Sequence, residues 1–322
     1  LGTEELPPKA LPTLSAALTE ELVRQLDDAG LGHGAVESFA APRRLAVLVR
    51  DLDAKQPDRQ VERLGPAVKA AFDGDGNPTK AAEGFAASVG LTVDQLDRQQ
   101  TDKGERLFAR LEETGRAAAE LVPEFVAQAV NKLPIPKRMR WGRRKVQFVR
   151  PAHWLVALFG KEVIDFELLD QQSGRATHGH RFHAPQAIEL AEAGDYATRL
   201  EQDGKGIADF GRRREMIRQQ AEQAGRDAGG EARIDDDLLD EVTALVEWPV
   251  ALAGRFDDDF LRVPQEALIS AMEEHQKYFS VLDADGKLMP RFITISNIES
   301  RDPAKVAAGN EKVIRPRLAD AA

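Results

Sequence analysis

The chain has 322 residues, of which 42% are hydrophobic and 30% charged, and its formal net charge is −10. This composition is typical of folded globular proteins, and the length allows two domains with substantial cores. The sequence holds no cysteine and no apolar run long enough to span a bilayer. We therefore expect a cytoplasmic protein without disulfides, a thiolate metal site or a membrane contact, and the acidic balance argues against DNA binding.

The N-terminal half predicts alternating helices and strands. Leucines recur every four residues from Leu14 to Leu26, which predicts an amphipathic helix that ends at Gly30. Because the first residue is Leu1 rather than Met, we expect a piece of a longer chain. Apolar alternation and turn residues predict strands at 36–39 and 45–49, an edge strand at 59–64, helices at 80–89 and 120–133, and a hairpin of 96–101 with 107–111.

The segment Leu133-Pro-Ile-Pro136 is the best candidate boundary, because alternate prolines favour an extended connector. We expect one α+β domain over 1–133 and a second over 134–322. The second half predicts strands at 154–159, 163–169 and 250–253, helices at 212–225, 235–245 and 264–274, and a hairpin of 278–282 with 291–298 about Asp285-Gly286.

A cationic segment follows the candidate boundary and has an indole in its middle. Cations neutralise phosphates and a flat ring stacks on a base, so the pattern favours contact with single-stranded or terminal RNA. A solvated basic loop whose tryptophan is buried in the core would explain the same pattern. The candidate RNA-binding residues of this segment are Lys137, Arg138, Arg140, Trp141, Arg143, Arg144 and Lys145.

A second candidate is His178-Gly-His-Arg-Phe-His183. On a continuous strand, His178 and His180 would share one face and His183 would point to the other. We expect no metal here, because no acidic residue adjoins the histidines to orient them. His180 and Arg181 are candidate RNA contacts, and histidines hydrogen-bonded at a strand end are the simpler alternative.

Other cations carry weaker signals. Lys277 lies at a helix-to-strand junction and is a candidate RNA contact, with a solvated lysine as the alternative. Arg43 and Arg44 are adjacent and should point to opposite faces, so at most one should join a given site. Arg212–Arg214 should form a solvated helix face with salt bridges.

Six separated segments, in one order, resemble the beta subunit of bacterial heterotetrameric glycyl-tRNA synthetase. The resemblance implies an α+β fold with mixed or antiparallel sheets, flanking helices and a B3/B4-like module similar to that of phenylalanyl-tRNA synthetase. The HD-type and anticodon-binding regions of the family are absent from this sequence. The six segments are Leu1–Ala10, Ala41–Ala46, Thr177–Phe182, Val246–Val250, His275–Ile298 and Asn310–Asp320.

The resemblance also implies partners: tRNA(Gly) and a separate catalytic alpha subunit, where ATP and Mg are expected. In this chain we expect no cofactor and no catalytic residue, since it shows no phosphate loop, no nucleophile elbow and no adenylation signature of either synthetase class. A tRNA-positioning role follows from the resemblance. Two alternatives stay open: an editing-type aminoacyl-tRNA hydrolase using His178, His180 or Glu274, and a structural module that docks the alpha subunit through an exposed apolar patch.

Overall fold

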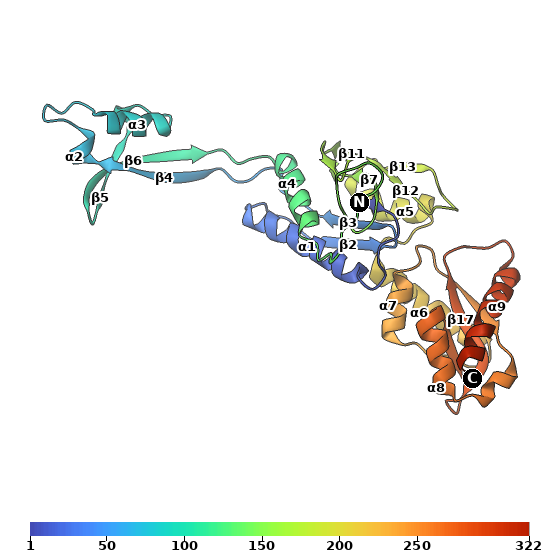
Figure 1. Ribbon diagram of the computed structural model, residues 1–322. Helices are drawn as coiled ribbons and strands as arrows, with labels where there is room; N and C mark the ends of the chain where they lie inside the picture. Colours follow the sequence, from blue (N-terminus) through green and yellow to red (C-terminus); the bar gives the residue numbers. More distant parts are fainter. Residues whose placement is uncertain (322) are drawn as a thin grey trace. The chain divides into compact units, whose positions relative to one another are not determined.

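The computed structural model describes residues 1–321, which fold into several small sheets with flanking helices (Figure 1). The expected α+β class is confirmed. The chain divides into two compact units. Unit 1 comprises Leu1–Gln25, Gly34–Asp51 and the residues from Val122 onward, and unit 2 comprises Leu26–His33 and Leu52–Leu121. The expected boundary after residue 133 falls inside unit 1, and a domain division there stays a prediction.

Unit 1 contains a six-stranded sheet in the order β10-β11-β7-β1-β3-β2. β11 pairs with β7 in parallel, whereas β1 pairs antiparallel with both β3 and β7. The leucine stripe of α1 packs on this sheet together with α4, in one core that holds Leu14, Leu45 and Val130. The elements are β1 (Gly2–Thr3), α1 (Leu11–Asp28), β2 (Val36–Ala41), β3 (Arg44–Val49), α4 (Ala118–Asn131), β7 (Ala152–Val156), β10 (Glu167–Leu168) and β11 (Gln171–Gly174).

Short elements connect this sheet to the rest of unit 1. The strands expected at 154–159 and 163–169 are each broken in two, and the inner pair turns at Gly160, whose φ is +59°. β12 and β13 form a separate antiparallel pair that precedes a helix. These elements are β8 (Leu158–Phe159), β9 (Glu162–Val163), β12 (Ala176–His178), β13 (Ala187–Glu189), η2 (Ala193–Asp195) and α5 (Tyr196–Gly204).

A second sheet of unit 1, β14-β16-β17-β15, is antiparallel throughout and has helices on both faces. Neighbouring residues of β17 point to opposite faces: Ile293 packs with α6 and α7, and Phe292 packs with α8 and α9. The expected hairpin is confirmed, with Gly286 at φ +77° in its turn. The elements are α6 (Phe210–Asp227), β14 (Glu231–Ala232), α7 (Asp236–Thr243), β15 (Val250–Arg255), η3 (Asp258–Arg262), α8 (Gln265–Ser270), the π-helix η4 (Ala271–Gln276), β16 (Phe279–Leu282), β17 (Leu288–Ser296) and α9 (Pro303–Ala321).

Unit 2 is a three-stranded sheet, β4-β6-β5, with helices packed on it around Ala82 and Leu107. It confirms the edge strand, the helix that begins after Thr79 and the hairpin that turns at Gly104, where φ is +103°. The elements are β4 (Arg59–Ala67), α2 (Val68–Ala71), α3 (Lys80–Ser88), η1 (Val93–Gln95), β5 (Asp97–Thr101) and β6 (Gly104–Glu113).

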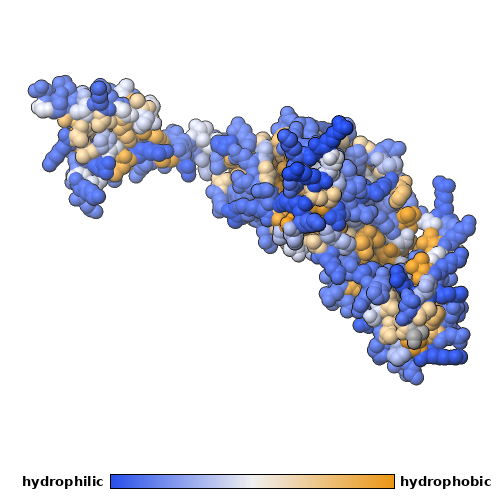
Figure 2. Space-filling model, viewed as in Figure 1, coloured by the Kyte–Doolittle hydropathy of each residue, from blue (hydrophilic) through white to orange (hydrophobic). Residues whose placement is uncertain are grey.

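The visible surface is mostly hydrophilic, with hydrophobic residues gathered in separate patches (Figure 2). Within residues 1–321, no helix combines the length and the apolar character that crossing a membrane requires.

Candidate nucleic-acid interface

The cationic segment forms a closed loop on unit 1. Met139 and Phe148 exchange two backbone hydrogen bonds, with N–O distances of 2.8 and 3.1 Å, which tie the two ends of the loop together. Phe148 is fully buried, and Trp141 packs half-buried against the same core. Gly142, at φ +59°, turns the chain between Trp141 and the cations that follow. The core thus fixes the base of the loop while its tip stays in solvent.

The cations of this loop are not neutralised by neighbouring carboxylates. Across the described chain, no ion pair involves any lysine or arginine between 137 and 145. Arg138 donates to the Asn131 carbonyl at 2.8 Å, and Arg140 lies 3.0 Å from the side-chain amide of Gln147. The exposed cations of the segment are Lys137, Arg140, Arg143, Arg144 and Lys145. A concentrated positive charge therefore stands on a chain whose net charge is −10.

The ring of Trp141 is only partly accessible to a base that would stack on it. Its indole N–H is enclosed and lacks a hydrogen-bond acceptor within the described residues. The alternative in which the indole packs on the core is thus confirmed in part, and the charge of the loop is its accessible feature.

The second candidate segment is a turn and not a strand. β12 ends at His178, so the expected shared face of His178 and His180 is wrong. The His178 ring lies 4.9 Å from the Trp154 ring. His180 is 1% exposed, its Nε2 donates to the Asn297 carbonyl at 2.6 Å, and its Nδ1 accepts from the backbone N–H of Phe182 at 3.1 Å. This confirms the simpler alternative of a hydrogen-bonded histidine at a strand end.

The hydrogen bonds of His180 also decide its charge. A carbonyl can only accept, so Nε2 carries the proton, and Nδ1, which receives backbone N–H groups, carries none. Burial lowers the pKa of His180 and the pKa of His178 below their ordinary value, which keeps both rings neutral near pH 7. His180 is enclosed and both of its ring nitrogens are occupied, so it offers no free donor or acceptor to an RNA.

Arg181 is exposed and Lys277 is half-buried, and both are paired with a carboxylate. Arg181 contacts Glu4 at 2.7 Å with both side chains about half exposed. Lys277, which has a left-handed φ of +60°, contacts Glu241 at 3.0 Å. The exposed Arg181–Glu4 pair is weak and exchanges readily with other partners, whereas Lys277 and Glu241 are only 27% and 19% exposed. These two cations can therefore serve only as secondary contacts.

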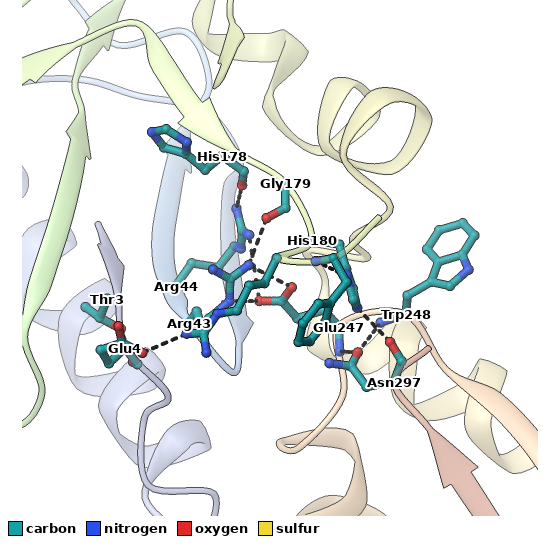
Figure 3. A network of polar contacts seen from close by, with 12 residues as sticks. Thr3, Glu4, Arg43, Arg44, His178, Gly179, His180, Glu247, Trp248 and Asn297 are labelled. Atoms are coloured by element: carbon teal, nitrogen blue, oxygen red, sulfur yellow. Dashed lines mark hydrogen bonds and ion pairs between the residues drawn. The ribbon is translucent and has the colours of Figure 1, made fainter. Parts of the chain in front are cut away.

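A buried cluster of charges lies beside the segment His178–His183, called the histidine turn from here on (Figure 3). Arg43 donates to both carboxylate oxygens of Glu247, at 3.0 and 3.2 Å, and to the Gly179 carbonyl at 2.8 Å. Arg44 donates to the His178 carbonyl at 2.7 Å and lies 3.7 Å from Glu247. Both arginines reach one carboxylate, so the expectation that they serve different faces is wrong. Arg43 lies in the turn before β3 begins, where strand alternation does not apply.

Two more contacts complete the cluster. The side-chain oxygen of Asn297 accepts from the backbone N–H groups of Glu247 and Trp248, at 2.8 and 3.1 Å (Figure 3). Burial by itself would raise the pKa of Glu247, but attraction to Arg44 and Arg43 outweighs it, and the pKa lies below its ordinary value. Glu247 is therefore a buried carboxylate that stays ionised.

Arg213 is a further correction, because it is fully buried and not part of a solvated face. It donates to the carbonyls of Thr243, Ile207 and Ala40 at 3.0, 2.7 and 2.8 Å. Burial lowers its pKa to about 10, so it remains charged at neutral pH. Its neighbours Arg212 and Arg214 do form the expected ion pairs with carboxylates.

The cluster ties together four segments of unit 1: the β2–β3 turn, the end of β12, the loop after α7 and the end of β17. Sequence reasoning missed Glu247 as a partner, although a carboxylate between Val246 and Trp248, in an apolar run, is a sign of burial. No hydrogen bond or ion pair of the described chain joins the exposed Glu274 to His178 or His180. Residues 1–321 hold no group of three or more histidine and acidic side chains placed for a metal ion.

Comparison with known proteins agrees with the sequence resemblance. The family described as glycyl-tRNA synthetase beta subunit matches residues 1–322. The glycine–tRNA ligase beta subunit of Marinobacter nauticus is 58% identical over the whole chain and 47% of its own length. The subunits of Chromohalobacter salexigens and Hahella chejuensis are 56% and 52% identical over the whole chain, and 46% of each is covered.

The chain spans about half the length of these curated relatives. The match nevertheless covers every segment described above, including the cationic loop, the histidine turn and the buried cluster. The chain belongs to the glycyl-tRNA synthetase beta subunit family.

Proposed function

We propose that this chain is the tRNA-binding and tRNA-positioning part of a glycyl-tRNA synthetase beta subunit. A separate alpha subunit would attach glycine to tRNA(Gly) with ATP and Mg, and this chain would supply no bond-making group. Holding the tRNA so that its terminal adenosine reaches the catalytic site turns a bimolecular encounter into a local one, which is a large contribution to rate.

The unpaired cationic loop is the observation that carries this proposal. RNA is a dense line of phosphates, and each lysine or arginine that neutralises one releases bound counterions. The exposed cations of the loop can bind a phosphate without first breaking an ion pair with a carboxylate. Elsewhere on the surface, Arg181 and Lys277 each lie against a carboxylate. An unpaired basic loop on an acidic chain favours RNA contact at that loop over non-specific binding of nucleic acid across the surface.

The editing hydrolase has less support. It requires a group that activates water within hydrogen-bond reach of an ester, yet His180 is enclosed and engaged at both nitrogens. The full-length protein, incubated with charged tRNA, should release no amino acid above the spontaneous rate. Release above that rate would establish the hydrolase instead.

The test of RNA positioning is a charge-matched pair of triple variants in the full-length protein. One replaces Arg143, Arg144 and Lys145 with Gln. The control removes the same charge at exposed cations that each pair with a carboxylate three residues away: Lys55, Arg262 and Lys305. Affinity for tRNA(Gly) is measured at several salt concentrations.

The loop variant should bind more weakly, and its salt slope should flatten by roughly 2 to 3 units if each cation contacts one phosphate. The control should keep nearly the original slope. Equal behaviour of the two variants would show that only net charge matters and would remove the loop from the interface.

A further inference from the structure

We propose that Phe182 is a stacking platform for an unpaired base of the bound RNA. The inference rests on the proposed RNA-binding function and adds a second contact of a different kind: the cationic loop holds phosphates, and the aromatic ring at the histidine turn holds one nucleotide by its face.

Exposure singles out this ring. Phe182 is 69% exposed and is the most exposed large hydrophobic side chain of residues 1–321. Single exposed hydrophobic side chains are common on protein surfaces, but an aromatic ring offers a flat face on which a base can stack. Its sequence neighbours Arg181 and His183 are polar, and its ring centroid lies 6.1 Å from that of the enclosed His180.

The backbone beneath the ring is held firmly. The Nδ1 atom of His180 accepts from the N–H groups of Phe182 and His183, at 3.1 and 3.2 Å. The Ala184 N–H donates to the His180 carbonyl at 2.9 Å, and the Glu299 N–H donates to His183 Nε2 at 3.0 Å. The ring therefore projects from a turn that is already ordered, so that little conformational entropy is lost when a base stacks on it.

Cations stand near enough to the turn to hold the phosphates next to a stacked base. Arg181 precedes the ring and contacts Glu4 at 2.7 Å. Lys205 contacts Glu299, whose backbone N–H binds the turn, at 3.3 Å, and it lies over the Trp248 ring. These pairs are exposed, so a phosphate can replace the carboxylate at little cost. An aromatic face with cations beside it is the usual arrangement for single-stranded nucleic acid.

The same ring could instead anchor a protein partner, and chemistry distinguishes the two. A base stacks on a flat aromatic face, whereas a protein pocket accepts a branched aliphatic side chain of similar size. Three variants of the full-length protein exploit this difference: Phe182→Tyr keeps the ring, Phe182→Leu keeps apolar volume without a ring, and Phe182→Ala keeps neither. Ile298→Ala, at a 40% exposed neighbour in the adjoining loop, is the control.

Affinity is measured for a tRNA(Gly) transcript and for a fully paired RNA duplex of similar length. The Tyr variant should bind the transcript like the parent, while the Leu and Ala variants should lose at least about fivefold, with an unchanged salt slope. On the duplex, all four variants should equal the parent. Because Phe182 is exposed, these substitutions should leave the unfolding midpoint nearly unchanged, which separates lost contact from lost fold.

Parental affinity of the Leu variant beside a weakened Ala variant would overturn the proposal in favour of an apolar partner. Parental affinity of all Phe182 variants, with a weakened loop variant, would overturn base stacking and leave RNA positioning intact. Insensitivity of both the ring and the loop would reject the function itself.

Discussion

At the scale of single residues, Glu247 is the buried carboxylate that pairs with Arg43 and Arg44. It is 2% exposed and receives two hydrogen bonds from Arg43. Removing one partner of a buried ion pair leaves the other charge uncompensated, so Glu247→Ala should lower the free energy of unfolding by roughly 3 to 5 kcal/mol. Tryptophan fluorescence during urea unfolding can follow this, because Trp141, Trp154 and Trp248 all lie in unit 1.

The matched control is Glu37→Ala. Glu37 pairs with Arg50 at 2.9 Å, but both side chains are nearly half exposed, so its loss should cost less than about 1 kcal/mol. A cost for Glu247→Ala no greater than this would mean that the cluster does not hold the four segments together.

His180 should make stability depend on pH. Burial keeps the pKa of His180 in the folded chain below the ordinary value of 6.5. At a pH between the folded-chain pKa and 6.5, the ring is therefore protonated in the unfolded chain and neutral in the folded chain. Unfolding therefore becomes easier as the pH falls below about 6.5. His180→Gln removes this titrating group. The loss of unfolding free energy that the substitution causes should therefore be largest near pH 7.5 and decrease toward pH 5. Urea unfolding of both proteins across this range is the measurement, and a constant difference would contradict it.

At the scale of elements, sequence patterns predicted what depends on neighbouring residues. The turn at Asp285-Gly286 and the helix beginning after Thr79 follow from the preferences of those residues, and both are present. The patterns failed where a strand stops. Strand alternation was applied to His180, which lies beyond the end of β12, and to Arg43, which lies in the turn before β3. The buried cluster joins residues 49 to 204 positions apart in the sequence, and local spacing does not predict such contacts.

Gly179 provides a prediction for the histidine turn. A Cβ built there would lie 2.6 Å from the Cα and from the carbonyl oxygen of Gly204. Backbone cannot yield as a side chain can, so Gly179→Ala should force the turn away from α5 and cost about 1 to 3 kcal/mol of stability. Gly174→Ala is the control, because nothing lies within 4 Å of its Cβ position. Thermal unfolding of the pair is decisive: equal midpoints would show that the close approach is not needed.

At the scale of the whole molecule, composition and length predicted a folded chain with substantial cores, and the pattern of helices and strands predicted the α+β class, but neither predicted the two units of the structure. The two parts of unit 1 that flank β4–β6 are joined in the same cores, since α1 and α4 pack together although their first residues are more than a hundred positions apart. The candidate boundary at Pro134 and Pro136 lies within unit 1, whereas the larger segment of unit 2, Leu52–Leu121, is inserted between two segments of unit 1.

That arrangement makes the insertion removable. The Ala118 N–H donates to the Ala54 carbonyl at 2.8 Å, so a short glycine–serine linker can join Ala54 to Ala118 in place of residues 55–117. The described hydrophobic cores of unit 1 draw on residues outside 52–121. The shortened protein should therefore keep a cooperative unfolding transition by tryptophan fluorescence.

The shortened protein also tests where RNA is held. If the cationic loop makes the main phosphate contacts, replacing Arg143, Arg144 and Lys145 with Gln should flatten the salt slope of tRNA binding as much in the shortened protein as in the full-length one. A shortened protein that folds cooperatively but has lost this loop-dependent slope would place an essential part of the interface in the excised residues, because the effects of distant, independent sites usually add.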